Sequence, residues 1–296
     1  MIGVLCQGGM CNQMFQMAFG YVASKKLNTP YFAYNPKSLK YFELEHDFEK
    51  KNRSVMLKYI FINLFRKSKL LSKRSDYKEF KWWFMDWGVA KNVCVWDNSL
   101  DSKNYLLTNL KDNTYYEGYF QSEEYYEKYA DDIKKLFAIK LEYQSVFLET
   151  KQYMKTKKNI ALHIRRKDYL QHGDNRIGGS DITLPMSYYR NCLGQIKDIE
   201  QYNIIFVSDD IEFVKQEFGN ADNYYFENND EITDFQILKE AEIVIIANSS
   251  FSWWAAWLND KANKIVFAPE YFLGFKVKKY YPAGIKVKDW NWIKTE

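Results

Sequence analysis

The stretch that decides the fold is Asn159-Ile160-Ala161-Leu162-His163-Ile164-Arg165-Arg166-Lys167-Asp168-Tyr169. Its first half is an apolar run that is typical of a short buried strand. Its second half places two adjacent arginines at the strand end, where they are costly to bury unless an anionic group meets them. Ligands of parallel α/β sheets bind at strand ends, so a phosphate-bearing ligand is one explanation. A structural Arg–Asp pair is the other, and spacing alone does not separate the two.

Beyond this stretch, apolar strands and helical segments alternate to the end of the chain. The expected strands are 160–164, 204–207, 224–226, 243–247 and 265–268, and the expected helices are 187–199, 211–218, 234–241 and 251–258. A strand as continuously apolar as 243–247 belongs in a sheet that is covered on both faces. Strand–helix alternation with right-handed crossovers therefore predicts a doubly wound parallel sheet.

The chain opens with a similar pattern. A strand at 2–5 is followed by a turn containing Gly8 and Gly9 and by apolar residues at helical spacing up to Leu27. The glycines let the backbone approach a ligand, and the helix start offers free N–H groups. The turn lacks the dinucleotide GxGxxG and the phosphate-loop GxxxxGK[ST] fingerprints. Alone it is a weak signal, because such a turn is often only a turn.

The remaining N-terminal segments complete a first α/β domain. Strands are expected at 31–34 and 115–120, and a helix is expected from a Ser122 cap to about residue 137. Residues 138–158 are expected to connect the halves. The expected architecture is α/β, with two Rossmann-like domains, 1–150 and 151–296, that face a cleft.

Composition is that of a soluble globular protein, with 47% hydrophobic and 27% charged residues. The net charge of +4 is too weak to argue for a nucleic-acid partner. Four scattered cysteines fit a reducing compartment and indicate neither a disulfide nor a zinc site. No signal peptide and no apolar run of membrane-spanning length are evident, so a cytoplasmic location is expected.

One segment carries a concentrated positive charge. Residues 50–81 hold eleven Lys or Arg against two acids, Asp76 and Glu79, interleaved with apolar residues. Such a segment can lie on an anionic membrane surface, which would make the protein peripheral on the inner face of the cytoplasmic membrane. An ordinary helix with one solvated face is the alternative.

Three strand ends in the second half are polar and are expected to line one sheet edge. At the first, His163 and Arg165 share a face of the strand while Arg166 points the other way. We therefore expect Arg165 to face the ligand. Asp168 could orient an arginine, accept a proton or pair with Arg166, and pairing with Arg166 is the favoured interpretation.

The second strand end carries Asp209 and Asp210, and the third carries Asn248 to Ser252. We expect Asp210 to cap the following helix and Asp209 to contact a nucleoside. Three serines and an asparagine at a helix start exceed what one cap requires and suit an anion. With the arginines they suit a diphosphate. Because no DxD-type acidic pair stands out, we expect a metal-free site without a cofactor, in which protein cations neutralise the charge.

Several motifs together resemble the bacterial-type GDP-fucose-dependent α-1,2-fucosyltransferases, a glycosyltransferase family 11-like group. They are GGMCNQMFQMAFGYVASKKL at 8–27, EGYFQSEEYY at 117–126, HIRRKDY at 163–169, LPMSYYRNCL at 184–193, VSDD at 207–210, IIANSSFSWWAAWLN at 245–259 and KIVFAP at 264–269. The resemblance implies a GT-B fold and an inverting transfer of L-fucose from GDP-β-L-fucose, without metal. The acceptor it implies is O2 of a terminal galactose in an oligosaccharide. The basic segment would suit a lipid-linked glycan acceptor, such as an O-antigen of lipopolysaccharide, at the inner membrane face.

The resemblance also implies roles for individual residues. Arg165 resembles the arginine on the β-phosphate, with His163 and Asp168 as flanking catalytic-motif residues. The implied donor-binding residues are Gly9, Asn12, Arg166, Asp209, Asn248, Ser249, Ser250, Phe251 and Ser252. Cys11 and Lys167 stand where the family usually has glycine. Two other functions remain open: a glycosyltransferase with a different nucleotide-sugar, and a non-catalytic nucleotide- or glycan-binding protein.

Overall fold

The computed structural model of the protein describes residues 1–34, 39–44, 92–97 and 105–295. The described residues form two compact units, one that ends at Ala138 and one that begins at Ile139. The basic segment at 50–81 lies outside the described residues, and its expected membrane role stays a prediction. The domain division expected after residue 150 also stays a prediction.

The first unit is built on a four-stranded parallel sheet in the order β2-β1-β4-β3. Its strands are β1 (Ile2–Leu5), β2 (Tyr31–Tyr34), β3 (Asn92–Val95) and β4 (Thr114–Glu117), and its helices are α1 (Met10–Leu27), α5 (Tyr105–Thr108) and α6 (Ala130–Leu136). Helix α1 packs against β1 and β2, and its Phe19 ring stacks on Phe120 with centroids 4.0 Å apart. Aromatic stacking of this kind joins the helix to the segment after β4.

The expected single helix from Ser122 to residue 137 is wrong. Two 3₁₀ turns, Glu123–Tyr125 and Glu127–Tyr129, precede α6. Ser122 caps the first turn, where its hydroxyl accepts a hydrogen bond from the Glu124 N–H at 3.3 Å. Between the turns, Tyr126 leaves the helical conformation at φ −136° and ψ 2°. Its ring is fully buried and faces Phe15, so core packing overrides the local helix preference.

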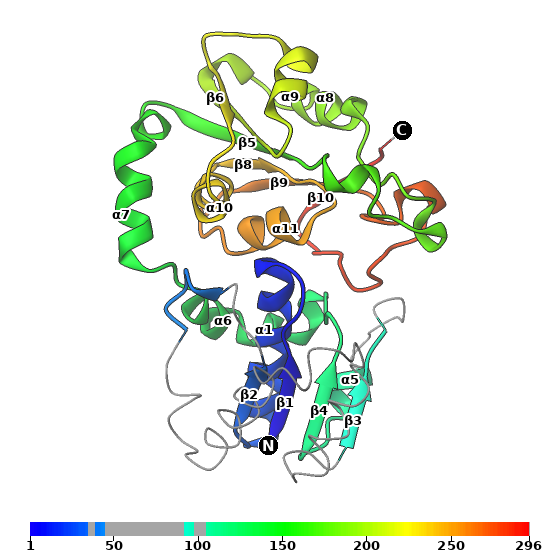
Figure 1. Ribbon diagram of the computed structural model, residues 1–296. Coiled ribbons are helices and arrows are strands. Elements are labelled where there is room, and N and C mark those ends of the chain that lie inside the picture. The colour runs from blue at the N-terminus through cyan, green and yellow to red at the C-terminus, as the bar shows by residue number, and fades with distance from the viewer. Residues whose placement is uncertain (35–38, 45–91, 98–104, 296) are drawn as a thin grey trace, which may run out of the picture. The chain divides into compact units, whose positions relative to one another are not determined.

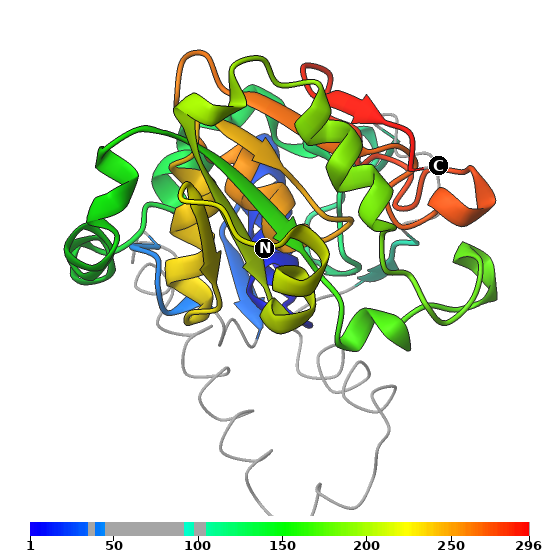
Figure 2. The same ribbon diagram turned by 90° about the horizontal axis from the view of Figure 1, so that it is seen from above.

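The second unit is built on a six-stranded parallel sheet in the order β10-β9-β8-β5-β6-β7. Its strands are β5 (Lys158–Ile164), β6 (Tyr202–Ser208), β7 (Tyr224–Glu227), β8 (Ile243–Ile245), β9 (Ile265–Pro269) and β10 (Asn291–Ile293). Its helices are α7 (Leu141–Thr150), α8 (Met186–Gly194), α9 (Ile211–Phe218), α10 (Glu231–Lys239) and α11 (Ser250–Trp257). In Figure 1, α8 and α9 lie on one face of this sheet and α10 and α11 on the other. Figure 2 shows the same strands from above.

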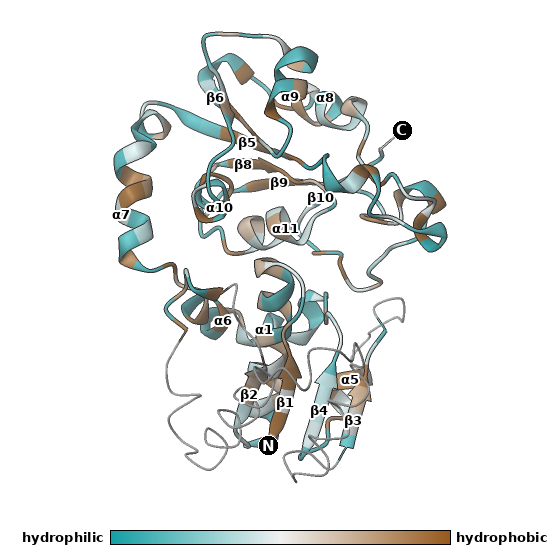
Figure 3. Cartoon of the chain, in the orientation of Figure 1, coloured by the Kyte–Doolittle hydropathy of each residue, from teal (hydrophilic) through white to brown (hydrophobic). Residues whose placement is uncertain are grey.

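Strands β5, β8 and β9 consist largely of apolar residues (Figure 3). On β5, Ile160, Leu162 and Ile164 pack in one buried cluster with Tyr188 and Cys192 of α8. The alternate residues face the opposite way, because successive side chains of a strand point to opposite faces. The expected doubly wound parallel sheet is therefore confirmed. Trp253 and Trp254 of α11 are fully buried.

Several elements of the second unit differ from expectation. Helix α8 ends at Gly194 instead of residue 199, and Asp198, just before the 3₁₀ turn Ile199–Gln201, has a left-handed φ of 51°. Strand β8 ends at Ile245, although the Ile246 N–H still donates to the Phe267 carbonyl at 2.9 Å. Helix α7 falls within residues 138–158, which were expected to form a connection. Only Phe147 of its residues is buried, so the helix has no long apolar face against the core.

No helix in the described part of the chain is both long enough and apolar enough to cross a membrane.

Candidate active site

The candidate site lies where the strand order of the second sheet reverses. From β5 the chain adds β6 and β7 on one side, then returns to place β8, β9 and β10 on the other. Strands β5 and β8 are therefore neighbours from different halves of the sheet, paired from Ile160↔Ile243 to Leu162↔Ile245. In open α/β sheets, ligands bind outside the carboxyl ends of the strands at this switch point. Arg165 follows β5 there, and the start of α11 follows β8.

Arg165 is held by two carboxylates and one aromatic ring. Its Nε and Nη2 donate to the two carboxylate oxygens of Asp168 at 2.7 and 2.8 Å. Its Nε also lies 3.6 Å from Oδ2 of Asp209, and its guanidinium carbon lies 5.8 Å from the ring centre of Tyr169. The guanidinium keeps one side open, with the side chain 36% exposed. A fixed, half-open arginine of this kind suits bidentate binding of a phosphate.

The charges of this pair support each other. Partial burial opposes the charged form of Arg165, but the hydrogen bonds and charge of Asp168 outweigh it and raise the pKa of the guanidinium. Burial likewise acts against the charged form of Asp168, and the hydrogen bonds from Arg165 outweigh it and lower the pKa of that carboxyl. Both groups are therefore ionised at neutral pH.

The expected pairing of Arg166 with Asp168 is wrong. Asp168 stands three residues after Arg165, and the turn that follows β5 brings these two together instead. Arg166 pairs with Asp210 at 3.3 Å and lies over the ring of Phe213 in α9, with 3.4 Å between guanidinium carbon and ring centre. The two arginines thus face different surroundings, as expected from their alternation along the chain.

His163 is a buried neutral imidazole beneath this arginine. It is 4% exposed, and its ring lies 5.2 Å from the Phe251 ring of α11. Burial, with the charge of Arg165 added, lowers the pKa of His163 to about 3. Its Nδ1 is buried and has no hydrogen-bond partner among the residues that the structure describes. A buried polar atom left unpaired at a strand end is a candidate for ligand recognition.

Asp209 fastens the turn after β5. Its two carboxylate oxygens accept the backbone N–H groups of Arg166 and Lys167 at 2.9 and 3.1 Å. The carboxylate therefore connects the ends of β5 and β6, and its expected contact with a nucleoside stays a prediction. Asp210 precedes α9, but the expected side-chain cap is wrong, because its carboxylate pairs with Arg166 and forms no hydrogen bond to the helix start.

The start of α11 supplies free backbone N–H groups and the positive end of a helix dipole. Ser249 is the cap, and its hydroxyl accepts the Phe251 N–H at 3.3 Å. Ser250, the first helical residue, is half-buried. Ser252 is fully buried, and its hydroxyl lies 3.4 Å from the carbonyls of Ala247 and Ser249. Of the predicted residues here, Ser250 and Phe251 are partly exposed, whereas Asn248, Ser249 and Ser252 are buried.

The two predicted residues of the first unit lie at a glycine turn. Gly8 has a left-handed φ of 79°, and a Cβ placed there would meet Asn12 Nδ2 at 2.7 Å, so only glycine fits. A Cβ at Gly9 would meet nothing within 4 Å. Asn12 accepts a hydrogen bond from Gln121 Nε2 at 3.0 Å. The geometry is that of a backbone turn ready for close approach, and its part in donor binding stays a prediction.

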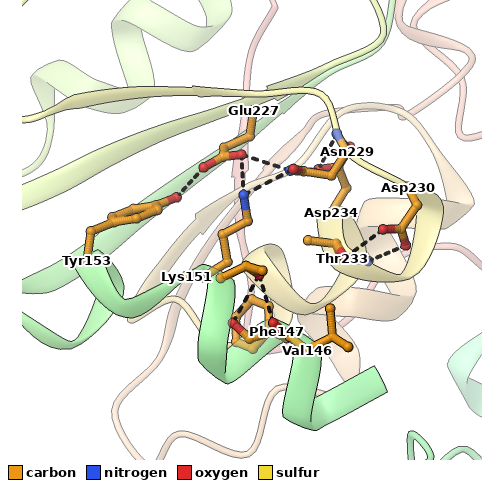
Figure 4. Close-up of polar contacts among 10 residues, drawn as sticks. Val146, Phe147, Lys151, Tyr153, Glu227, Asn229, Asp230, Thr233 and Asp234 are labelled. Carbon is orange, nitrogen blue, oxygen red and sulfur yellow. Dashed lines mark hydrogen bonds and ion pairs between the residues drawn. The ribbon is translucent and has the colours of Figure 1, made fainter. Parts of the chain in front are cut away.

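Sequence reasoning gave no role to a polar network beside the site. Figure 4 shows Lys151 and Tyr153 meeting Glu227 at the end of β7, with Asn229 linking them to Asp234 of α10. Asp234 is 9% exposed, and burial raises its pKa to about 6. Tyr169 was also given no role, although its hydroxyl reaches the Asn248 carbonyl at 3.2 Å.

Among the described residues, no cluster of three His, Cys, Asp or Glu side chains could hold a metal ion. The positive groups found at the switch point are Arg165 and the first turn of α11.

Comparisons with known proteins agree with this architecture. The chain is 29% identical over 294 residues to the O-antigen biosynthesis glycosyltransferase WbnK of Escherichia coli, which covers 90% of this chain and 93% of WbnK. It is 28% identical over 314 residues to an α-1,2-colitosyltransferase of Escherichia coli, which covers 98% of this chain and 97% of the relative.

Among solved structures, fucosyltransferase NodZ from Bradyrhizobium has a TM-score of 0.50 at 9% identity, over 86% of this chain and 90% of NodZ. NodZ α-1,6-fucosyltransferase soaked with GDP-fucose also has a TM-score of 0.50, at 12% identity, over 89% of this chain and 96% of that chain. These likenesses support the expected GT-B fold. The sequence profile of Glycosyl transferase family 11 matches residues 1–294, and this chain therefore belongs to that family of glycosyltransferases.

Proposed function

We propose that the protein transfers L-fucose from GDP-β-L-fucose to O2 of a terminal galactose, with inversion, to form an α-1,2-fucoside. The observation that carries the proposal is the convergence of Arg165 and the α11 start at the β5–β8 switch point. Membership of a glycosyltransferase family supports the proposal that this edge is the site of glycosyl transfer. The solved NodZ fold with GDP-fucose makes a GDP-sugar the first donor to test.

The proposed chemistry is the departure of GDP from C1 of fucose. Negative charge then builds on the diphosphate, where the Arg165 guanidinium and the free N–H groups of α11 stabilise it. The acceptor hydroxyl attacks C1 and loses its proton during or after attack. Asp168 fits the role of orienting Arg165 better than that of proton acceptor, because both its oxygens are bound by Arg165 and its pKa is lowered.

A second donor is favoured by a specific finding. One relative that matches along nearly the whole chain is an α-1,2-colitosyltransferase. Colitose is L-fucose without its 3-hydroxyl, so the same diphosphate site serves either donor. Specificity between the two then depends on one hydroxyl group of the sugar.

The test is a donor screen with the purified protein and galactose-terminated acceptors. GDP-fucose, GDP-colitose and UDP-galactose are compared, and the product linkage is assigned by NMR. Turnover with GDP-fucose and an α-1,2 product is expected. Turnover with GDP-colitose alone supports the second donor, turnover with UDP-galactose alone contradicts both, and GDP binding without turnover of any donor points to a non-catalytic protein.

The proposed acceptor is a galactose-terminated oligosaccharide or a lipid-linked glycan, which agrees with the O-antigen role of WbnK. A lipid-linked acceptor requires the protein to work at a membrane surface, and the basic residues at 50–81 supply the charge for this. Co-sedimentation with anionic vesicles at low salt tests that part. Protein that stays in the supernatant would contradict it.

A further inference from the structure

We propose that Asn248 and Tyr169 are positioning residues that latch the loop between β5 and α8 and thereby fix the Arg165 guanidinium. The proposal rests on the proposed function in one respect, since the ligand that Arg165 meets is taken to be a GDP-sugar diphosphate. Neither residue needs to touch that ligand in this role.

Arg165 depends on the loop for its orientation. Strand β5 ends at Ile164, so the strand ladder does not hold Arg165 itself. Its bidentate partner Asp168 and its neighbouring ring Tyr169 both belong to the loop, and they lie three and four residues further along. Asp209 holds the beginning of the loop through two backbone N–H groups. Something else must hold the part that carries Asp168 and Tyr169.

Three hydrogen bonds form a closed ring that does this. The Tyr169 hydroxyl donates to the Asn248 carbonyl at 3.2 Å. The Asn248 Nδ2 donates to the Ile182 carbonyl at 2.8 Å, and the Ile182 N–H donates to the Tyr169 carbonyl at 2.9 Å. Tyr169 and Ile182 come from opposite ends of the loop, and Asn248 comes from the end of β8. The ring therefore fastens both ends of the loop to the central part of the sheet.

The burial of these groups makes the ring stable. Ile182 is 0% and Asn248 is 1% exposed, so water does not compete for the bonds around the amide. The Oδ1 of Asn248 is also buried and has no partner among the described residues. An unpaired buried acceptor costs free energy that an apolar side chain would avoid. As a core residue alone, Asn248 would thus lower stability. Its hydrogen bond to the loop gives the asparagine side chain a role that an apolar side chain could not fill.

Small errors in the position of Arg165 have large effects on transfer. A displacement of about 1 Å of a positioning group can cost about 100-fold in rate. Loss of the latch would let Asp168 and Tyr169 move together, and the guanidinium would move with them. The latch therefore acts on the site through Arg165.

The chain offers matched controls for both residues. Asn259 is also 1% exposed, and its Nδ2 also donates to a backbone carbonyl, that of Ala241, at 2.8 Å. The buried Tyr188 hydroxyl donates to the Ile246 carbonyl at 3.0 Å. In the described part of the chain, neither the Asn259 side chain nor the Tyr188 side chain forms a hydrogen bond to the loop. Asn259→Ala and Tyr188→Phe thus measure the general effect of removing a buried hydrogen bond from a side chain to a backbone carbonyl.

The first measurement is GDP affinity by calorimetry together with kcat and KM. Asn248→Ala and Tyr169→Phe are expected to weaken GDP binding about tenfold and to lower kcat more than they raise KM for the acceptor. The control variants are expected to change both by less than about twofold at a similar loss of thermal stability. In an Arg165→Ala background, the latch substitutions are expected to have no further effect on GDP affinity. Additive effects there would overturn the proposal, because they would show action independent of Arg165.

The second measurement does not depend on the donor. Hydrogen exchange at the Ile182 and Leu170 amides is expected to accelerate in Asn248→Ala and to stay unchanged in Asn259→Ala. Unchanged exchange in Asn248→Ala would overturn the latch. Wild-type protein that binds no GDP would overturn the proposed function, whereas the exchange data would still decide whether Asn248 holds the loop.

Discussion

Adjacent residues at the end of β5 have opposite surroundings. Arg166 is paired with Asp210 and covered by Phe213, which satisfies it within the protein. Arg165 is oriented by Asp168 on one side and leaves its other side open. An arginine that is oriented but not enclosed is free to bind a phosphate, so the chemical difference between the two comes from their partners alone.

Arg165→Lys is expected to lower kcat about 100- to 1,000-fold, because an ammonium group keeps the charge but not the planar pair of donors. Steady-state kinetics with GDP-fucose measure the change. Arg190→Lys is the control. Arg190 is an exposed residue of α8 that pairs with Glu217 of α9. Near-normal activity of Arg165→Lys would show that the charge alone is sufficient.

His163 makes the stability of the fold depend on pH. Its pKa is about 3 in the folded state against 6.5 ordinarily, so the unfolded chain takes up a proton before the folded chain does. The contribution of neutral His163 to the free energy of unfolding is fully present above pH 6.5 and is lost progressively as the pH falls toward 3. About 2 kcal/mol is lost by pH 5. Urea unfolding of wild type and His163→Leu at a series of pH values measures this effect. The free energy of unfolding of the wild type is expected to fall relative to that of His163→Leu as the pH is lowered over this range. Parallel pH curves would contradict the prediction.

At the scale of elements, a nearly buried polar network fastens the segment after α7 to the sheet. Lys151 Nζ donates to Glu227 Oε2 at 2.7 Å and to Asn229 Oδ1 at 3.0 Å, and the Tyr153 hydroxyl donates to Glu227 Oε1 at 2.8 Å (Figure 4). The side chains of Lys151 and Glu227 are only 11% and 13% exposed. An ion pair this sheltered is costly to break from one side.

Lys151→Met is expected to lower the free energy of unfolding by about 3 kcal/mol, because it leaves the Glu227 carboxylate buried without its cation. The exposed pair of Lys215 and Glu212 provides a control, and Lys215→Met is expected to cost less than about 1 kcal/mol. Denaturant titration measures both. Adding Glu227→Gln to Lys151→Met should recover part of the loss, and a further loss would contradict the explanation.

At the scale of the whole molecule, two parallel sheets each carry a polar turn at the carboxyl end of their first strand. In the first unit, Gly8 and Gly9 follow β1. In the second unit, Arg165 follows β5 and the serine-rich start of α11 follows β8. The positive charge that the proposed diphosphate site requires would thus be supplied by Arg165 and the helix start of the second unit.

Turnover is therefore expected to persist after dialysis against excess EDTA, and added Mg²⁺ or Mn²⁺ is expected to change kcat by less than about twofold. An arginine and a helix start can do what a divalent ion does in metal-dependent transferases. Kinetics with and without chelator measure the effect. Loss of activity in EDTA that is restored by Mg²⁺ would contradict the prediction.

Much of the fold could be predicted because its signals are local. The apolar runs of β5, β6 and β9 and the serine-rich start of α11 follow from sequence alone. Helix α10 begins at Glu231, three residues before its expected start, behind an Asp230 cap that was not expected. The expected helix after Ser122 failed because burial of Tyr126 outweighed helix preference, and α7 was missed because it buries little. Strand β10 is a three-residue edge strand whose pattern is too short to read.

The sequence by itself determined the parallel α/β class, the polar strand ends and the different surroundings of Arg165 and Arg166, because these depend on side-chain alternation and on residue type. Only the tertiary structure decided which acid meets which arginine, that Asn248 reaches Ile182, and that Lys151 reaches Glu227. Those contacts join residues that are distant in the chain or brought together by a turn. Their geometry depends on how the strands and loops pack, which local sequence does not specify.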